Sequence, residues 1–430
     1  MRYTVLAFLC AIAIIAYVQR TGLNAVKRPI CNDVGINTED FGALGSALLV
    51  GYAMMQVPAG WLADRFGGRN VLAALAIVWS ILTGLLGWCP NFEIMLWLWF
   101  AMGLALAGVF PCAAKSIGAW FDDTEKAMAS GLLGSSTMLG LAAASVLTVR
   151  LVTYRGLDWQ WTYVLYGVAG VIWAGAYFLL IPERHTTKEA AAPMVWSDWI
   201  RLAKSVPLWL LCGQQFFRAG AMIFFINWFP AFLQESLTFS EYDAGVNASL
   251  VGVAAMTGGI MGGFFSDWLL RRTGMRRLSR QGIAVAGMTA AGGLVLGAQF
   301  VAAPIVAVWM FGAAAFIASF GGVSGYTVAI ELGGKRIGVV FSMMNMAGNF
   351  SGAIVNFVAG ALTQRTGSWD AALFLIAGIF AVDAVCWALL NPKGPLFGDD
   401  SRGAGGSPAQ ETGIHAGEPP APRGRDDDAR

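Results

Sequence analysis

Long apolar runs separated by short polar interruptions make up most of the chain. They cover residues 3–25, 40–62, 70–88, 93–117, 128–150, 160–181, 206–229, 244–267, 281–301, 304–327, 337–362 and 369–391. A helix of roughly 20 apolar residues is long enough to cross the hydrocarbon core of a bilayer. The pattern therefore predicts twelve transmembrane helices in an all-α integral membrane protein. The first run follows Arg2 like a signal peptide, but Tyr17, Gln19 and Arg20 interrupt it and no small-residue cleavage site follows, so we expect it to be retained.

The composition is typical of a membrane protein and argues against several other classes of protein. Of 430 residues, 57% are hydrophobic and 13% are charged, whereas about a quarter of residues are charged in soluble domains. A net charge of +2 argues against a basic nucleic-acid binder. Two histidines and six cysteines without metal-ligand spacing predict no metal, no cofactor and no disulfide framework. Without a nucleophile motif or a phosphate-binding glycine loop, we do not expect an enzyme.

A repeat divides the chain into two halves. Gly60-Trp-Leu-Ala-Asp64-Arg65 follows the second run and Gly263-Phe-Phe-Ser-Asp267-Trp follows the eighth, and the two aspartates are 267 − 64 = 203 residues apart. Parallel six-helix repeats are one architecture of transporters. We expect two pseudo-symmetric six-helix bundles at 1–182 and 206–392, a polar linker at 183–205, and a disordered tail at 393–430.

Loop charges predict the orientation. The loops on the side of the termini carry fourteen Lys and Arg residues, against five on the other side. Because short cytoplasmic loops are rich in Lys and Arg, both termini are predicted to be cytoplasmic.

The second run and its loop resemble a known family. Gly51-Tyr52-Ala-Met-Met-Gln56-Val-Pro58-Ala-Gly60-Trp-Leu-Ala-Asp64-Arg65-Phe-Gly67 is similar to the second helix and following loop of the major facilitator superfamily. Within it the chain resembles the anion:cation symporters, which include bacterial hexonate and hexuronate carriers and vesicular glutamate and sialic acid carriers. The subfamily resemblance rests on short segments in five regions: Tyr17-Val-Gln-Arg20, Gly-Val-Phe-Pro111 with Trp120-Phe, Asn227-Trp-Phe-Pro230-Ala-Phe-Leu, Ser266-Asp267 and Asn345-Met-Ala-Gly-Asn349-Phe-Ser-Gly.

The resemblance implies a secondary transporter of the bacterial inner membrane that carries a small organic anion, such as a sugar acid, by alternating access. It implies a monomer in the lipid bilayer, with a proton or sodium ion as a possible co-substrate. It also implies that Asp64, Arg65 and Arg69, with Asp267 in the repeat, belong to a cytoplasmic gate. A carboxylate near a helix N-terminus is favourable, which suits Asp64 to this role, and the alternative, that the residues only orient the loop by the positive-inside rule, fits the arginines better than Asp64.

Two arginines lie inside predicted membrane helices. An arginine at the helix centre costs at least about 2.5–3.5 kcal/mol on insertion, so it is expected to face a polar cavity or a partner. Arg20 lies in the first run and Arg218 in the seventh, 218 − 20 = 198 residues apart, close to the repeat offset. We therefore predict that both face one central cavity and bind an anion by charge-assisted hydrogen bonds. Snorkelling or a structural ion pair is the alternative.

Other polar residues could complete the site. Tyr17 lies one turn before Arg20, and Asn345 and Asn349 share a face of the eleventh run with each other. Tyr52, Ser324 and Tyr326 are further candidates for substrate contacts. For Tyr17 and Tyr52, hydrogen bonding between helices is an equal alternative, and for Gln56 and Gln214 it is preferred.

Departures from the resembling family concern the coupling ion. Proton-coupled relatives have an aspartate where this chain has Gln19, and an arginine and a glutamate where it has Trp99 and Leu106. Coupling through those carboxylates is unavailable, so we expect a weak response to a pH gradient. An electrogenic uniporter or an anion exchanger stays open, and a receptor that does not transport is a remote alternative. Glu331 is expected to cap or gate the cytoplasmic end, and Asp383 is unexplained.

Overall fold

The computed structural model describes residues 1–89, 91–184, 194–391 and 394–397. Much of the predicted linker and almost all of the predicted tail (185–193, 392–393 and 398–430) lie outside these residues. The described part of the linker includes a short helix, α9 (Trp196–Ala203).

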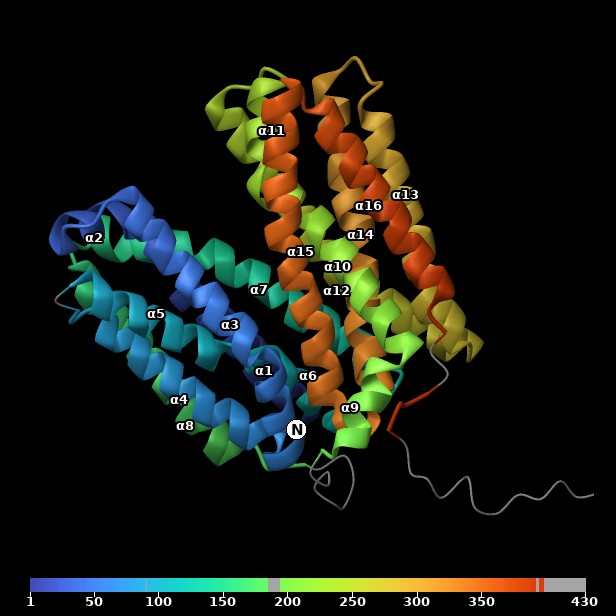
Figure 1. Cartoon of the computed structure of the whole chain (residues 1–430), viewed down its shortest axis with the longest axis horizontal. Helices are drawn as coiled ribbons and strands as arrows, with labels where there is room; N and C mark the ends of the chain where they lie inside the picture. The colour runs from blue at the N-terminus through green and yellow to red at the C-terminus, as the bar shows by residue number, and fades with distance from the viewer. Residues whose placement is uncertain (90, 185–193, 392–393, 398–430) are drawn as a thin grey trace, which may run out of the picture. The chain divides into compact units, whose positions relative to one another are not determined.

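Helices form all of the membrane-spanning elements in the described residues (Figure 1). The spans are α1 (Arg2–Thr21), α3 (Thr38–Phe66), α4 (Gly68–Leu86), α5 with α6 (Phe92–Leu106 and Val109–Trp120), α7 (Lys126–Val149), α8 (Trp159–Leu180), α10 (Val206–Asn227), α12 (Glu241–Thr273), α13 (Ile283–Ala298), α14 (Pro304–Gly333), α15 (Ile337–Thr366) and α16 (Asp370–Leu389). The short α2 (Lys27–Val34) and α11 (Phe229–Glu235) lie between spans.

Eleven stretches of the described chain are helical, apolar and long enough to cross a membrane. One of them, Pro304–Thr366, contains both α14 and α15. Counted separately, these two give the twelve spans that the sequence pattern predicts.

Two predicted runs differ in detail from the helices. The fourth run is broken between α5 and α6 at Ala107 and Gly108, where the motif Gly108-Val-Phe-Pro111 begins. The first run ends as an α-helix at Thr21 and continues as a 3-10 turn, η1 (Gly22–Val26). The break in the fourth span starts a new helix beside the cavity described below.

Successive spans reverse direction, so the loops fall on two sides. The terminal side carries Met1 and the loops that follow α3, α6, α8, α12 and α14, and the far side carries the others. Helices α3 and α15 pack against each other, as do α7 and α12, and these pairs join the first six spans to the last six.

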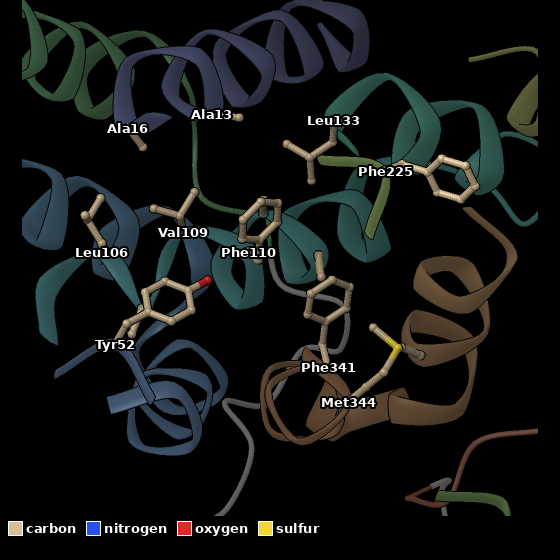
Figure 2. Close-up of a cluster of buried hydrophobic side chains, with 14 of the residues drawn as sticks. Ala13, Ala16, Tyr52, Leu106, Val109, Phe110, Leu133, Phe225, Phe341 and Met344 are labelled. Carbon is tan, nitrogen blue, oxygen red and sulfur yellow. The ribbon is translucent and has the colours of Figure 1, made fainter. Parts of the chain in front are cut away.

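Buried side chains fill the space where these helices meet. Tyr52 and Phe110 of the first half lie near Phe341 and Met344 of the second in one hydrophobic cluster (Figure 2). Tyr326 bridges the two sets, with its ring centroid 6.3 Å from that of Phe110 and 5.0 Å from that of Phe341. Tyr52, Phe110 and Tyr326 of this cluster also line the cavity described below.

Candidate functional site

A cavity of about 680 Å³ lies between the two halves. Its lining comes from α1, α3, α6, α7, α10, α12, α14 and α15, and extends from mid-helix to Asn227 at the far-side end of α10. Volumes of this size are typical of sites for small molecules.

Arg20 is one of two guanidinium groups that line the cavity. Its Cζ lies 5.8 Å from the ring centroid of Tyr17 and 5.5 Å from that of Tyr52. Aromatic faces attract a cation without neutralising it. Because Arg20 forms no ion pair with a described carboxylate, its charge is available to an anion in the cavity.

Arg218 is the second guanidinium. Its Nη2 donates a hydrogen bond of 2.9 Å to Oε1 of Gln215, and its guanidinium packs against Gly322, where a Cβ would lie 2.9 Å from Nη1. Its Nε is buried without a hydrogen-bond partner among the described residues. The structure thus brings both predicted arginines to one cavity, from helices that the repeat relates.

The predicted asparagines lie at the wall between the halves. Nδ2 of Asn345 donates to Oη of Tyr52 at 3.3 Å and to Oε1 of Gln56 at 3.2 Å. Asn349, one turn further, donates to the carbonyl of Asn345 at 3.0 Å. Tyr52, Asn345 and Asn349 line the cavity, and Gln56 is fully buried beneath it, so the predicted interhelical role of Gln56 is observed.

Of the remaining candidates, Tyr17 and Tyr326 line the cavity but Ser324 does not. Ser324 is completely buried, and its Oγ has no partner among the described residues. Residues two apart on a helix point about 200° apart, so Ser324 and Tyr326 face different directions. The expectation that both contact substrate is corrected for Ser324.

Sequence reasoning missed several polar lining residues. Gln215 lines the cavity and accepts a hydrogen bond from Arg218. Its neighbour Gln214, for which the sequence favours hydrogen bonding between helices, is fully buried and donates to the carbonyl of Leu211 in its own helix. Ser130 and Ser135 of α7 also line the cavity. The three-residue spacing from Gln215 to Arg218 was a usable signal, but single serines in an apolar helix gave none.

Asp64 joins the halves on the terminal side. Its carboxylate accepts hydrogen bonds from the backbone N–H groups of Gly338, at 2.9 Å, and Val339, at 3.0 Å, in the first turn of α15. Lys115 of α6 pairs with the same carboxylate at 2.9 Å. Gly60, one turn earlier, has no room for a Cβ against the carbonyl of Gly338, so the glycine allows the close approach that these bonds need.

Asp267 makes the same contact in the repeat. It accepts hydrogen bonds from the N–H of Met128 at 2.7 Å and of Ala127 at 3.4 Å, in the first turn of α7. Arg280 pairs with it at 2.8 Å and with Glu331 at 3.4 Å. A Cβ on Gly263 would lie 2.5 Å from the carbonyl of Ala127. We call the Asp64 and Asp267 contacts the two latches.

The other loop residues contact their own half. Arg65 is exposed over the rings of Trp61 and Phe66. Arg69 donates to the carbonyl of Phe178 and lies 4.4 Å from its ring centroid. These contacts orient the loop and do not reach the second half.

A cluster of charges surrounds Asp123 in the terminal-side loop before α7. Asp123 pairs with Lys126 at 2.6 Å and with Arg276 of the second half. Burial alone would raise the pKa of the Asp123 carboxyl, but the hydrogen bond and charge of Lys126 and the charges of Arg276 and Arg280 hold that pKa below its ordinary value. This loop therefore adds a further polar contact between the halves on the terminal side.

Comparison with known proteins assigns the family. Residues 9–354 match the Major Facilitator Superfamily. The chain belongs to this superfamily. It is therefore a membrane transporter and not an enzyme, as the resemblance implied.

Relatives and solved structures within the superfamily agree with this assignment. The chain is 26% identical over 408 residues to the "Probable sulfoacetate transporter SauU" of Cupriavidus necator, covering 91% of this chain and 94% of that one. It is 28% identical over 441 residues to the "Probable galactarate/D-glucarate transporter GudP" of Escherichia coli strain K12, covering 93% and 94%. The crystal structure of the superfamily transporter FucP in the outward conformation matches with a TM-score of 0.71 at 15% identity, over 90% of this chain and 98% of that chain.

The three positions that depart from proton-coupled superfamily members are all buried in the structure. Gln19 is fully buried, donating to the carbonyl of Tyr166 at 2.7 Å and accepting from Nε1 of Trp79 at 2.8 Å. Its side chain therefore points into the first half and not beside Arg20 in the cavity. Trp99 and Leu106 are 2% and 3% exposed, so these positions offer no titratable group to the cavity.

Proposed function

We propose that this transporter carries a small organic anion with one or two carboxylate or sulfonate groups, such as a sugar acid. The observation that carries the proposal is that Arg20 and Arg218 line one cavity and form no ion pair with a described carboxylate. Guanidinium groups bind such anions through paired, charge-assisted hydrogen bonds. The printed names of the relatives, sulfoacetate and galactarate/D-glucarate transporters, describe anions of this class.

The remaining lining suits a hydroxylated substrate. Hydroxyl and amide groups of Tyr17, Gln215 and Asn349 supply donors and acceptors within a mostly apolar wall. In this arrangement the arginines neutralise the charge and the neutral groups select the carbon skeleton.

We propose that the two latches close the cavity on the terminal side. Loop charges favour a cytoplasmic location for both termini, and the relatives are bacterial, so the protein belongs in the inner membrane and the latched state faces outward. Breaking both latches would release α15 from α3 and α12 from α7 and open the cytoplasmic side. The cavity lies within one chain, so a monomer suffices for this cycle.

Anion exchange or uniport is the second candidate. It is favoured by the buried, non-titrating Trp99 and Leu106 and by the orientation of Gln19 away from the cavity. Exchange of anions across the membrane (counterflow) at a rate that does not change with pH would support this candidate.

Ligand-induced thermal stabilisation of the purified protein tests the proposal. A ligand that binds the folded state raises its apparent stability. The panel includes galactarate, D-glucarate, sulfoacetate, neutral sugars, amino acids and inorganic anions. We expect stabilisation by organic acids and much less in Arg20→Lys, since lysine lacks the planar guanidinium fork. Stabilisation by neutral sugars alone would refute the anionic substrate class.

A further inference from the structure

Asp383 is a buried carboxylate that neither latch nor cavity uses. It lies in α16, its residue is 0% exposed, and both carboxylate oxygens lack a hydrogen-bond partner among the described residues. A buried charge is normally paired, because leaving it alone in an apolar interior is very costly, whereas a neutral carboxylic acid is tolerated far better. The local structure therefore favours a protonated Asp383 in this state.

Arg218, one of the two cavity arginines, lies on a helix that packs against α16. Helix α16 packs against α10, α13, α15 and the π-helical turn η3 (Arg277–Gly282). The charged side chain of α15 is Arg365 in its last turn, and in η3 Arg277 bonds Gln281 while Arg280 pairs with Asp267 and Glu331. Arg218 of α10 is a positively charged group that interacts electrostatically with the Asp383 carboxyl. Helix α13 carries no charged side chain, and the thiol of Cys386 is the other titratable group that interacts with Asp383.

Both Arg218 and Asp383 carry buried polar atoms without hydrogen-bond partners among the described residues. Nε of Arg218 and Oε1 of Gln214, one turn away on α10, are buried without partners, as are both oxygens of Asp383 on the neighbouring α16. Buried polar atoms are normally satisfied. Nε of Arg218 is a donor and the oxygens of a deprotonated Asp383 are acceptors, so their lack of partners on two packed helices indicates a second arrangement in which these two groups pair.

We propose that Asp383 is the proton-binding site of this transporter and that it competes with the anion for Arg218. In the latched state Arg218 faces the cavity, free to bind the anion, and Asp383 holds a proton. When the latches open and the anion leaves, Asp383 releases the proton and its carboxylate pairs with Arg218. The proposal rests on the anion-binding role of Arg218. It places proton coupling on α16, and not at the positions of Gln19, Trp99 and Leu106.

The first test needs no substrate. Infrared spectra of the purified full-length protein in lipid nanodiscs are recorded for the wild type and for Asp383→Asn, with Asp370→Asn on the same helix as the exposed control. In the latched state at neutral pH, the difference between wild type and Asp383→Asn should contain the carbonyl stretch of a protonated carboxylic acid, shifted in D₂O. The control should lack this difference. Absence of the band from the wild type would overturn the proposal.

The second test measures affinity for galactarate between about pH 6 and 8, where its carboxylates stay ionised. Because the deprotonated Asp383 competes for Arg218, the wild-type Kd should rise with pH, by at most about tenfold per unit for one linked proton. Asp383→Asn should bind with a flat profile, and Asp383→Glu and Asp370→Asn should keep the slope. A flat wild-type profile, or an unchanged slope in Asp383→Asn, would overturn the proposal. Failure of the wild type to bind any panel anion would instead refute the proposed function, and the infrared result would still decide the state of Asp383.

Discussion

Replacing Asp64 with asparagine tests the latch most sharply. The side chain of Asp64 is 0% exposed and its two oxygens accept N–H bonds of 2.9 and 3.0 Å from α15. The asparagine side chain would keep one acceptor oxygen, so Asp64→Asn loses about one hydrogen bond to a charged acceptor, worth roughly 1.5–3 kcal/mol. At about 1.4 kcal/mol per factor of ten, the population open on the terminal side should rise about 10- to 150-fold.

The assay is the alkylation rate of a thiol introduced by Ser342→Cys. Ser342 lies on α15, fully buried against Gly60 of α3. A hydrophilic maleimide is added from the terminal side, and modification at this position is followed by mass spectrometry. When opening is faster than the reaction, the rate follows the open population. It should therefore rise by the same factor in Asp64→Asn.

Arg65→Gln is the matched control. It removes a charge one residue away that contacts only rings of its own half. An alkylation rate that is the same in folded Asp64→Asn and in Arg65→Gln would refute the latch.

Three further predictions concern buried and loop contacts. Gln19→Leu leaves the Trp79 N–H and the Tyr166 carbonyl without hydrogen-bond partners and should lower the free energy of unfolding by about 1–3 kcal/mol. The thermal midpoint of unfolding in detergent should therefore fall. An unchanged midpoint would contradict this contact. Gln19→Asp should likewise destabilise the protein without adding a pH response, because position 19 faces away from the cavity. The pKa of Asp123 is lowered in the folded state, so its ionised carboxylate stabilises the folded protein at neutral pH. This contribution is lost as the pH falls through the folded-state pKa. Thermal stability of the wild type should therefore fall more steeply below about pH 4 than that of Asp123→Asn, and parallel curves would contradict the assignment.

The fold was readable from the sequence because each span must satisfy its backbone internally and present about 20 apolar residues to lipid. The break at Gly108 was not visible, since both sides of it are apolar. The repeat offset predicted that Arg20 and Arg218 line one cavity, and both do, because the helices that carry them face the space between the halves.

Orientation around each helix was harder to predict. Gln19 and Arg20 are neighbours in sequence but point about 100° apart on a helix, so Arg20 lines the cavity while Gln19 is buried within the first half. The same rotation separates Ser324 from Tyr326. The neighbours of Asp383 depend on how α16 packs against α10, and contacts between residues so far apart in sequence cannot be read from local pattern.

The central claim is that two guanidinium groups share one anion. A double-mutant cycle with Arg20→Lys and Arg218→Lys, measured as galactarate affinity by calorimetry, tests it most directly, because lysine keeps the charge and leaves weakened binding measurable. Groups that contact one ligand are coupled, by about 0.5–3 kcal/mol in such cycles. We predict that the loss of binding free energy in the double variant differs from the sum of the two single losses by at least about 0.5 kcal/mol. Strict additivity, or wild-type affinity in either single variant, would contradict it.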